Sequence, residues 1–332
     1  MDRGHAWYRL AQVEGLGPKR LHAIRRTFAA ANRPLDDIFG LDLTEFHRLL
    51  PMLPVALHAR IQTTRNKRVD REYRALHDEG IEVVHPDHVA FPAALSARLG
   101  DAAPPLLYCG GALGLLASDA VAIVGSRHAS PDGLAAATTL AIELAALGQN
   151  VISGYAPGTD TAAHLGALRA GGTTTIVLST GIREFAPKHD IAPLLRGDNA
   201  LVVSQFPPAA GWNAQNAMAR NKVVCALARA LIVVEAGPER DERGRMSGTF
   251  DAGKAALGMG VPVFVLDPAA FSVAPLGNTG LLALGGTPLR EVKALGQLLG
   301  DLVPAPVQGS GLTSGRNSVG RRAPQERGDA GR

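Results

Sequence analysis

The chain has 332 residues, 46% of them hydrophobic, which is enough to form the core of one extended domain or of two smaller ones. Its two cysteines, Cys109 and Cys225, lie far apart in apolar stretches, which argues against a disulfide framework and against a cysteine-based metal site. No segment offers the roughly 18 consecutive apolar residues of a membrane span, and the amino terminus lacks the apolar run of a signal peptide. We therefore expect a cytoplasmic protein with no membrane association.

The formal net charge of +4 is unevenly distributed along the chain. Basic residues outnumber acidic ones in residues 1–76 and in residues 303–332, whereas the long stretch between them is slightly acidic. A phosphate-binding site in this middle stretch would have to come from local clusters of Arg, Lys and backbone N–H groups, because the overall field does not provide one.

Residues 1–78 are predicted to form a small all-helical N-terminal domain of the helix-hairpin-helix or SAM-like type. The predicted helices cover residues 7–13, 19–30, 43–50 and 55–77. The sequence VEGLGPKRLHAI resembles a helix-hairpin-helix element, in which the turn Gly15-Leu16-Gly17 would expose backbone N–H groups to a phosphate. A plain corner between two helices explains the same sequence, so both interpretations stay open.

From Ile81 onward, short β-branched runs alternate with Ala- and Leu-rich helical stretches, which is typical of a parallel sheet with helices on both faces. We expect residues 79–302 to form a Rossmann-like α/β domain with a mixed edge. The predicted strands are residues 81–84, 106–108, 121–124, 151–152, 174–178, 200–204, 230–234 and 261–266. The predicted helices are residues 132–147, 159–170, 212–228, 247–258 and 278–285. Residues 303–332 are rich in Gly, Ser, Pro and Arg and are expected to form a disordered basic tail.

Ligands of open α/β sheets bind at the carboxyl ends of the strands, and two loops there suit an anion. After residues 121–124 comes Gly125-Ser126-Arg127, where loop N–H groups and a guanidinium could meet a phosphate. This loop lacks the second and third glycines of the dinucleotide fingerprint, which disfavours NAD or FAD. After residues 151–152 comes a turn with Ser153, Gly154 and Gly158, followed by Asp160 near a helix start. Asp160 could equally be a simple N-cap, and His164 a packing residue.

Two further loops combine cationic, aromatic and amide side chains. The loop after residues 174–178 carries Gly181, Arg183, Phe185 and Lys188, a combination that suits a strand with phosphates and stackable bases. Phe185 could instead be tucked inward. The helix before residues 230–234 carries Arg220-Asn221-Lys222, a candidate phosphate clamp, although a solvated helix would show the same residues.

The runs VAIVGSR, SGYAPGTDTAAH, GIREFAP, SQFPP, ARNKVVCALARALIVVEA and MSGTFDAGKAALGMGVPVFVLD together resemble the successive blocks of the DNA-processing DprA/Smf family, over roughly residues 100–290. The resemblance implies a Rossmann-like fold, sequence-independent binding of single-stranded DNA, a homodimer, and delivery of a RecA-type recombinase in natural transformation. The sequence offers neither a metal-ligand cluster nor an assembled nucleophile and base, so we expect no catalytic residues, no cofactor and no metal. The residues expected to contact DNA are Gly125, Ser126, Arg127, Ser153, Gly154, Gly158, Asp160, Gly181, Arg183, Phe185, Lys188, Arg220, Asn221, Lys222 and Ser247.

The chain departs from the family pattern at several points. Arg-Asn-Arg is usual where Arg220-Asn221-Lys222 stands, Ser-Glu-x-Pro is usual at residues 204–207, and Tyr-Pro is usual at residues 185–187. The segment GPERDERGR, residues 237–245, is an insertion before Ser247. The winged-helix module with which many relatives end does not fit residues 303–332, which are too short and too polar.

Two alternatives use a similar fold. One is a nucleotide-hydrolysing enzyme of the lysine-decarboxylase-like or phosphoribohydrolase group, which carries a Gly-Gly-x-Gly-Thr-x-x-Glu run. Residues 246–251, Met-Ser-Gly-Thr-Phe-Asp, offer neither the leading glycine pair nor the Glu. The other is a nucleotide-sensing module that keeps the phosphate loops without binding DNA.

Overall fold

The computed structural model describes residues 3–302, and it begins with a helical region. The predicted tail, residues 303–332, lies outside the described residues. The helices of the first region are α1 (Arg3–Ala11), α2 (Pro18–Ala30), α3 (Leu43–Leu49), α4 (Ala56–Thr63) and α5 (Lys67–Asp78). Helix α2 begins at Pro18, whose fixed φ and missing N–H suit the first turn of a helix.

The single helix expected over residues 55–77 is wrong, because α4 ends at Thr63 and α5 starts at Lys67. Between them Asn66 adopts an extended conformation with φ −136°. Its side-chain oxygen accepts hydrogen bonds from the backbone N–H groups of Arg68 (3.1 Å) and Val69 (3.0 Å). An asparagine that satisfies the first free N–H groups of a helix is an N-cap, so the chain starts a second helix here instead of extending the first.

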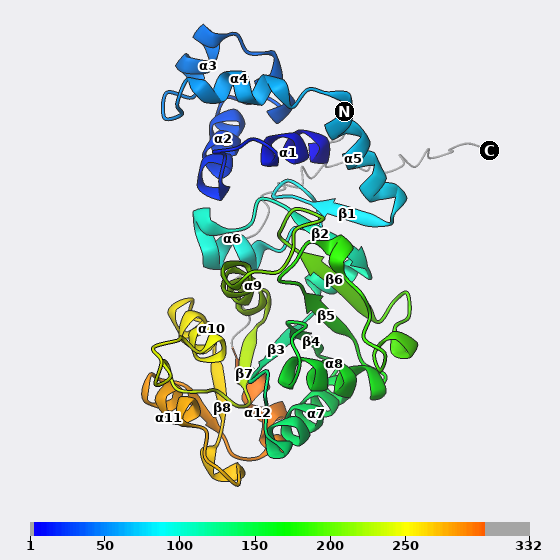
Figure 1. Ribbon diagram of the computed structural model, residues 1–332, viewed down its shortest axis with the longest axis vertical. Helices are drawn as coiled ribbons and strands as arrows, with labels where there is room; N and C mark the ends of the chain where they lie inside the picture. The colour runs from blue at the N-terminus through cyan, green and yellow to red at the C-terminus, as the bar shows by residue number, and fades with distance from the viewer. Residues whose placement is uncertain (1–2, 303–332) are drawn as a thin grey trace, which may run out of the picture. The chain divides into compact units, whose positions relative to one another are not determined.

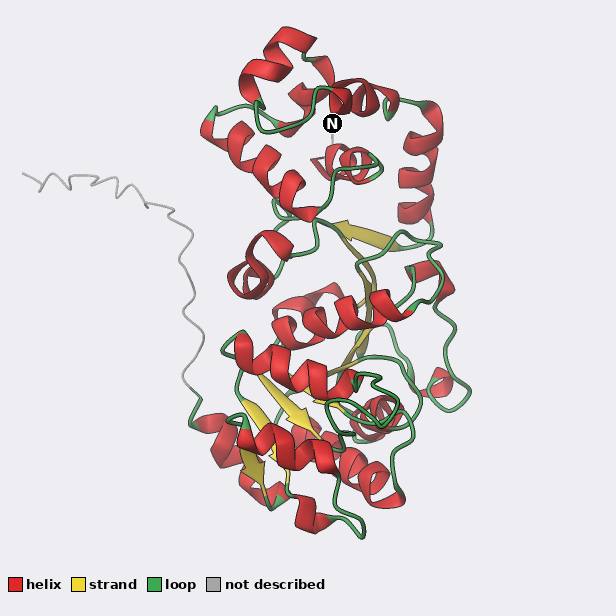
Figure 2. Cartoon of the chain, turned by 60° about the vertical axis from the view of Figure 1, so that its left-hand side comes forward, coloured by secondary structure: helices red, strands yellow, loops and turns green. Residues whose placement is uncertain are grey.

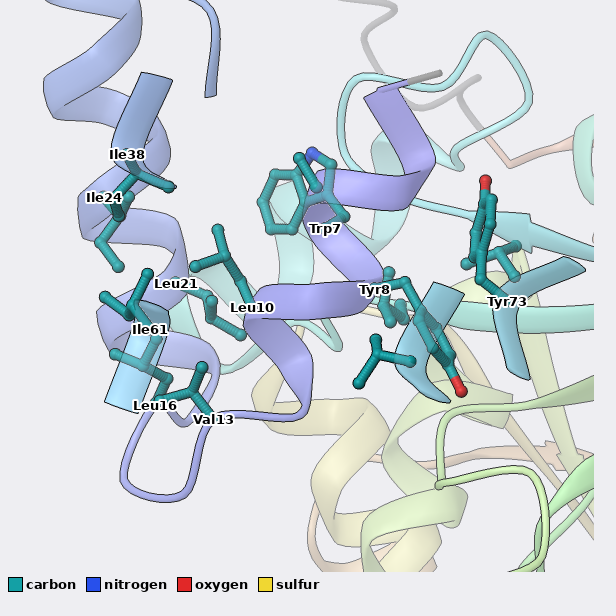
Figure 3. Close-up of a cluster of buried hydrophobic side chains, with 14 of the residues drawn as sticks. Trp7, Tyr8, Leu10, Val13, Leu16, Leu21, Ile24, Ile38, Ile61 and Tyr73 are labelled. Atoms are coloured by element: carbon teal, nitrogen blue, oxygen red, sulfur yellow. The ribbon is translucent and has the colours of Figure 1, made fainter. Parts of the chain in front are cut away.

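The helical region packs around α1. Trp7, Tyr8 and Leu10 are buried and lie in one apolar cluster with residues of α2 and α4 (Figure 3). The same cluster includes Val83 and Tyr108 of the first two strands, so the helices and the sheet share a core. Residues up to Leu302 accordingly belong to one compact unit. The division between residues 78 and 79 into two domains remains a proposal.

The second region is a nine-stranded mixed sheet with the strand order β1-β2-β6-β5-β4-β3-β7-β8-β9 (Figure 1). Strands β3 to β9 pair in parallel, whereas β1 and β2 form an antiparallel edge. The strands are β1 (Ile81–Val84), β2 (Leu107–Gly111), β3 (Ala120–Val124), β4 (Asn150–Ser153), β5 (Thr174–Val177), β6 (Ala200–Ser204), β7 (Ala230–Val233), β8 (Val263–Leu266) and β9 (Thr287–Leu289). The predicted Rossmann-like α/β sheet with a mixed edge is confirmed.

Helices cover both faces of this sheet (Figure 2). Alternate residues of β3 explain the two layers: Val121 and Ile123 join the core beneath α7, α8 and α12, and Ala122 and Val124 join the core beneath α6, α9, α10 and α11. The helices are α6 (Ala93–Leu99), α7 (Pro131–Ala146), α8 (Thr159–Arg169), α9 (Ala214–Leu227), α10 (Gly248–Gly258), α11 (Leu276–Ala283) and α12 (Leu295–Gly300). Helices α6 and α12 and strand β9 were not predicted from the sequence.

The topology brings the predicted loops together. From β3 the chain moves outward through β4, β5 and β6, and then returns to place β7 on the other side of β3. A crevice opens at such a reversal, outside the carboxyl ends of the two central strands. The loops that follow β3 and β7 therefore lie side by side at the middle of the sheet.

Among residues 3–302, no helix is both long enough and apolar enough to cross a membrane.

Asn278 of α11 ties this edge of the sheet together. It is fully buried, donates to the carbonyl oxygens of Val234 (2.8 Å) and Leu266 (2.9 Å), and accepts from the N–H of Ala236 (2.8 Å).

Asn278→Ala should lower the free energy of unfolding by about 3 kcal/mol, because it leaves three buried backbone groups without a hydrogen-bond partner. Urea denaturation followed by circular dichroism measures this. Gln215→Ala, on the exposed face of α9, should change stability by less than about 0.5 kcal/mol. Equal stability of the two variants would contradict the assignment.

Candidate nucleic-acid interface

A cavity of about 540 Å³ lies in the crevice between β3 and β7. The loop after β3 forms one wall with Gly125, Ser126 and Arg127, and the start of α10 forms another. Two of the predicted residues lie on the walls formed by α9 and α10, namely Asn221, whose amide donates to the carbonyl oxygen of Gly248 (3.1 Å), and Ser247. The Ser247 hydroxyl caps α10 by accepting from the N–H of Phe250 (3.3 Å).

The floor of this first cavity is the guanidinium of Arg220, which is only 5% exposed. One terminal nitrogen donates to the carbonyl oxygen of Val177 (3.0 Å), at the end of β5. The same nitrogen lies 3.9 Å from a carboxylate oxygen of Asp160. Its Nε is buried and has no hydrogen-bond partner among the described residues. An unpaired donor on a buried cation carries a large desolvation cost, so this atom would gain from an anionic ligand.

Asp160 is held beside Arg220 at the start of α8. It accepts a hydrogen bond from the N–H of Ala156 (3.2 Å), so it stabilises the turn before the helix. Burial raises the pKa of the Asp160 carboxyl above its usual value, and the neighbouring Arg220 only partly offsets the rise. A Cβ atom at Gly154 would overlap both the Arg220 guanidinium and the Asp160 carboxylate. Glycine is therefore required here, because the backbone lies against the ion pair.

A second cavity, of about 320 Å³, shares Arg127, Ala156, Trp212 and Arg220 with the first. Its other walls include Tyr155 and the loop after β5. Phe185 lies against Tyr155, with ring centroids 5.3 Å apart, so the predicted loop aromatic lines a cavity.

Lys188 holds the wall of the second cavity in place. Its Nζ donates to the carbonyl oxygens of Tyr155 (3.1 Å) and Ala156 (3.2 Å) and lies 4.4 Å from the centre of the Tyr155 ring. Partial burial lowers the pKa of Lys188, and Asp160 partly offsets the change. Lys188 is thus a positive group at the cavity wall whose donors are engaged with the protein.

Trp212 is the main residue that the sequence analysis missed. It lies between β6 and α9, it is 57% exposed, and it lines both cavities. The Arg127 guanidinium lies 5.7 Å from the centre of its ring. A largely exposed tryptophan beside an arginine is a surface on which a flat ring can stack. The sequence predicted Trp212 as the first residue of a helix over 212–228, whereas α9 begins at Ala214 and Trp212 stands in the loop before it.

Several predicted residues do not line either cavity. We expected Arg183 and Lys222 to converge with Arg127, Lys188 and Arg220, and this expectation is wrong for both. Arg183 makes two hydrogen bonds to Glu79, from Nε (2.8 Å) and a terminal nitrogen (2.7 Å), and faces the helical region. Lys222 is exposed on α9 and lines neither cavity, although Asn221 before it and Val224 after it line the first.

Three predicted polar or glycine positions serve the backbone. The hydroxyl of Ser153 donates to the carbonyl oxygen of Ile123 (2.6 Å) and so joins β4 to β3. Gly158 has φ +76°, and a Cβ there would meet the backbone of Ser126 and Arg127. A Cβ at Gly181 would meet the carbonyl oxygens of Pro207 and Pro208. These residues position the loops on which the cavity-lining side chains stand.

The turn that resembles a helix-hairpin-helix element also uses arginines internally. Gly15 has φ +91°, and its carbonyl oxygen accepts from Arg20 (2.6 Å), while the carbonyl oxygen of Glu14 accepts from Arg60 (3.1 Å). Contact of this turn with DNA stays a prediction.

His164 of α8 links the loop after β4 to the core. It is fully buried, its Nε2 donates to the carbonyl oxygen of Gly154 (2.6 Å), and its Nδ1 lies 2.7 Å from the Thr174 hydroxyl. Burial lowers the pKa of His164 to about 4. A packing residue is the interpretation that these contacts favour.

This burial predicts a pH dependence of stability. His164 binds its second proton more weakly in the folded protein than in the unfolded chain. The contribution of the buried neutral His164 to the free energy of unfolding is therefore present above about pH 6.5 and is lost as the pH falls toward 4. The loss should reach on the order of 3 kcal/mol. Urea unfolding of the parent and of His164→Gln between pH 4 and 7.5 measures it. The Gln variant should lack this part of the acid sensitivity, and identical pH profiles would contradict the assignment.

Comparisons with known proteins agree with this architecture. A family model described as DNA recombination-mediator protein A matches residues 82–300. The DNA processing protein DprA of Streptococcus pneumoniae is 38% identical over 136 residues, which are 40% of this chain and 48% of that protein. This chain thus spans about half the length of that curated relative.

Two solved structures are similar over larger shares of the chain. DNA processing protein A from S. pneumoniae superposes on this chain with a TM-score of 0.74 at 24% identity. The superposed region covers 91% of this chain and 99% of the S. pneumoniae chain. DNA processing protein A from Helicobacter pylori, studied for its single-stranded DNA binding mode, has a TM-score of 0.55 at 26% identity, with coverage of 67% and 97%. The resemblance found in the sequence motifs is confirmed: this chain belongs to the DNA recombination-mediator protein A family, the DprA/Smf proteins.

Proposed function

We propose that the chain binds single-stranded DNA without sequence preference, in the two adjoining cavities beside β3. The observation that carries the proposal is the buried Arg220 guanidinium, which lines both cavities and whose Nε has no hydrogen-bond partner among the described residues. A phosphate is the anion that a nucleic acid would place there, and Arg127 adds an exposed guanidinium from the adjacent loop. The backbone of a single strand is flexible enough to reach such a recessed floor.

Stacking surfaces support a nucleic acid over a small anion. Trp212 stands at the shared wall, and Phe185 with Tyr155 lines the second cavity. Every base has a π-face, so aromatic platforms bind bases without reading their sequence. Hydrogen bonds to phosphates likewise fix position and carry no sequence information. The combination therefore favours sequence-independent binding.

The comparisons add support from outside the chain. The H. pylori relative was described for its single-stranded DNA binding mode, and the family model describes a recombination mediator. By extension we propose that this chain protects incoming single-stranded DNA and loads a RecA-type recombinase onto it, in the cytoplasm, during natural transformation or recombination. The site supports the DNA step of this proposal more directly than the recombinase step.

We also propose that the chain acts by binding and not by turnover, with no cofactor. The two acid–base candidates considered from the sequence, Asp160 and His164, use their polar atoms in internal hydrogen bonds. A homodimer is supported by the large exposed side chains of Val273, Leu276 and Leu284 around α11, which would be covered in a subunit interface. Light scattering at two protein concentrations tests the dimer.

The proposed site predicts the effect of Arg127→Ala. Affinity for fluorescein-labelled oligo(dT), measured by fluorescence anisotropy, should fall about fivefold to a hundredfold, which corresponds to the roughly 1–3 kcal/mol of a charge-assisted hydrogen bond. The slope of log affinity against log salt should flatten by about 0.7, since one phosphate contact is lost. Mixed-sequence strands should show the same change.

Lys222→Ala is the matched control, because Lys222 is an exposed cation on α9 that lines neither cavity. It should bind oligo(dT) within about twofold of the parent, as expected for a distant surface charge in physiological salt. If Arg127→Ala binds like the parent and Lys222→Ala does not, the site is misplaced. If free dTMP displaces the labelled oligo(dT) as effectively as unlabelled oligo(dT) does, the nucleotide-sensing alternative is favoured. If the protein releases a base or phosphate from a nucleotide, the nucleotide-hydrolysing alternative is favoured.

A further inference from the structure

The segment inserted relative to the family pattern forms a hairpin at the edge of the first cavity. Arg240 and Met246 pair in an antiparallel bridge. The N–H of Asp241 donates to the carbonyl oxygen of Arg245 (3.0 Å), and Gly244 closes the turn with φ +73°. Four residues of this segment, Gly237, Pro238, Asp241 and Arg245, line the cavity, as does Met246 directly after it. The hairpin is thus a wall of the proposed DNA site.

The hairpin is anchored to α10. The N–H of Ser247, the residue that caps this helix, donates to the carbonyl oxygen of Glu239 (3.1 Å), and the Lys254 ammonium donates to the Glu239 carboxylate (2.8 Å). These two hydrogen bonds, from the N-cap and from a side chain of α10, fix the base of the hairpin. Its tip, residues 241–245, carries the charged side chains at the cavity mouth.

At this tip, Asp241 and Arg245 form an exposed ion pair. Both the Nε and a terminal nitrogen of Arg245 lie 2.7 Å from one carboxylate oxygen of Asp241. The other carboxylate oxygen accepts from the backbone N–H groups of Arg243 (3.0 Å) and Arg245 (2.9 Å). The Arg245 side chain is 72% exposed and that of Asp241 is 36% exposed. Ion pairs this exposed to water contribute little to stability, so they exchange partners at low cost.

We propose that the hairpin is an additional phosphate-binding arm of the DNA site, in which Arg245 leaves Asp241 and binds a backbone phosphate of the single strand held over Arg220. This inference rests on the proposed function. A phosphate offers the planar guanidinium the same bidentate geometry as a carboxylate. The turn survives the exchange, because the backbone N–H groups of Arg243 and Arg245 keep the other Asp241 oxygen.

A separate observation indicates that the cavity beside Arg245 binds an anion. Arg220 and Arg245 line the same cavity. Arg220 is only 5% exposed, and its Nε has no hydrogen-bond partner among the described residues. The Asp241 carboxylate also lines this cavity, but it pairs with Arg245 and leaves the Nε of Arg220 without a partner. In this arrangement Asp241 acts as a competitor of the DNA phosphate for Arg245.

The competition gives variants with opposite signs. Arg245→Ala should raise the Kd for oligo(dT) about threefold to tenfold and flatten the salt slope by about 0.7, as for one lost phosphate contact. Asp241→Asn should lower the Kd by about twofold to threefold, since the amide oxygen can still accept from the turn while the competing charge is gone. Arg245→Lys should restore the salt slope but only part of the affinity, because an ammonium cannot bind bidentately.

The assay is fluorescence anisotropy of the full chain with labelled oligo(dT) at several salt concentrations, with Arg243→Ala as the matched hairpin control. Arg243 is exposed and does not line the cavity, so its variant should bind like the parent. If Arg127→Ala weakens binding but Arg245→Ala does not, the arm is refuted and the DNA site stands. If neither variant weakens binding, the proposed function itself fails. Weaker binding by Asp241→Asn would show that the ion pair only shapes the turn, and would overturn the exchange.

Discussion

The buried guanidinium of Arg220 is the constraint on which the arrangement of this site depends. A cation removed from water needs both an opposite charge and hydrogen-bond acceptors, and the protein supplies them from two elements. Val177 at the end of β5 gives a carbonyl oxygen, and Asp160 at the start of α8 gives a carboxylate. The requirement extends to Gly154, where any side chain would displace the pair. The loops after β4 and β5 are therefore built around one charge.

This charge is left incompletely satisfied by the protein. The Nε of Arg220 faces no acceptor among the described residues, and the shared wall of the two cavities above it carries Arg127 and Trp212. The sheet topology explains why these groups meet, since the strand order reverses at β3, with β4 on one side and β7 on the other, and a crevice opens there. A ligand with a phosphate and a flat base would satisfy both the donor and the aromatic surface. The fold thus positions an anion site and a stacking surface within one crevice.

The sequence predicted the central strands well because they are short runs buried on both faces, such as residues 121–124 and 200–204. It missed β9, a three-residue edge strand that contains Pro288, and the break at Asn66, where an N-cap interrupts a helical pattern. The loops that carry the cavity residues were found from their place after strands. The direction of each side chain was not predictable, because it depends on distant partners: Arg183 meets Glu79, 104 positions earlier, and Arg220 turns inward toward Asp160. Trp212 was overlooked because it lies outside the recognised blocks.

The fluorescence of Trp212 tests the central claim most directly. The chain has two tryptophans, Trp7, which is buried in the helical region, and Trp212, which is exposed at the shared wall of the cavities. Titration with unlabelled oligo(dT) should quench the emission saturably, because a base stacks on the indole, and should protect it from acrylamide. In Trp212→Phe the remaining Trp7 emission should not respond. Binding detected by anisotropy without any change in the Trp212 emission would contradict the account and place the DNA elsewhere on the protein.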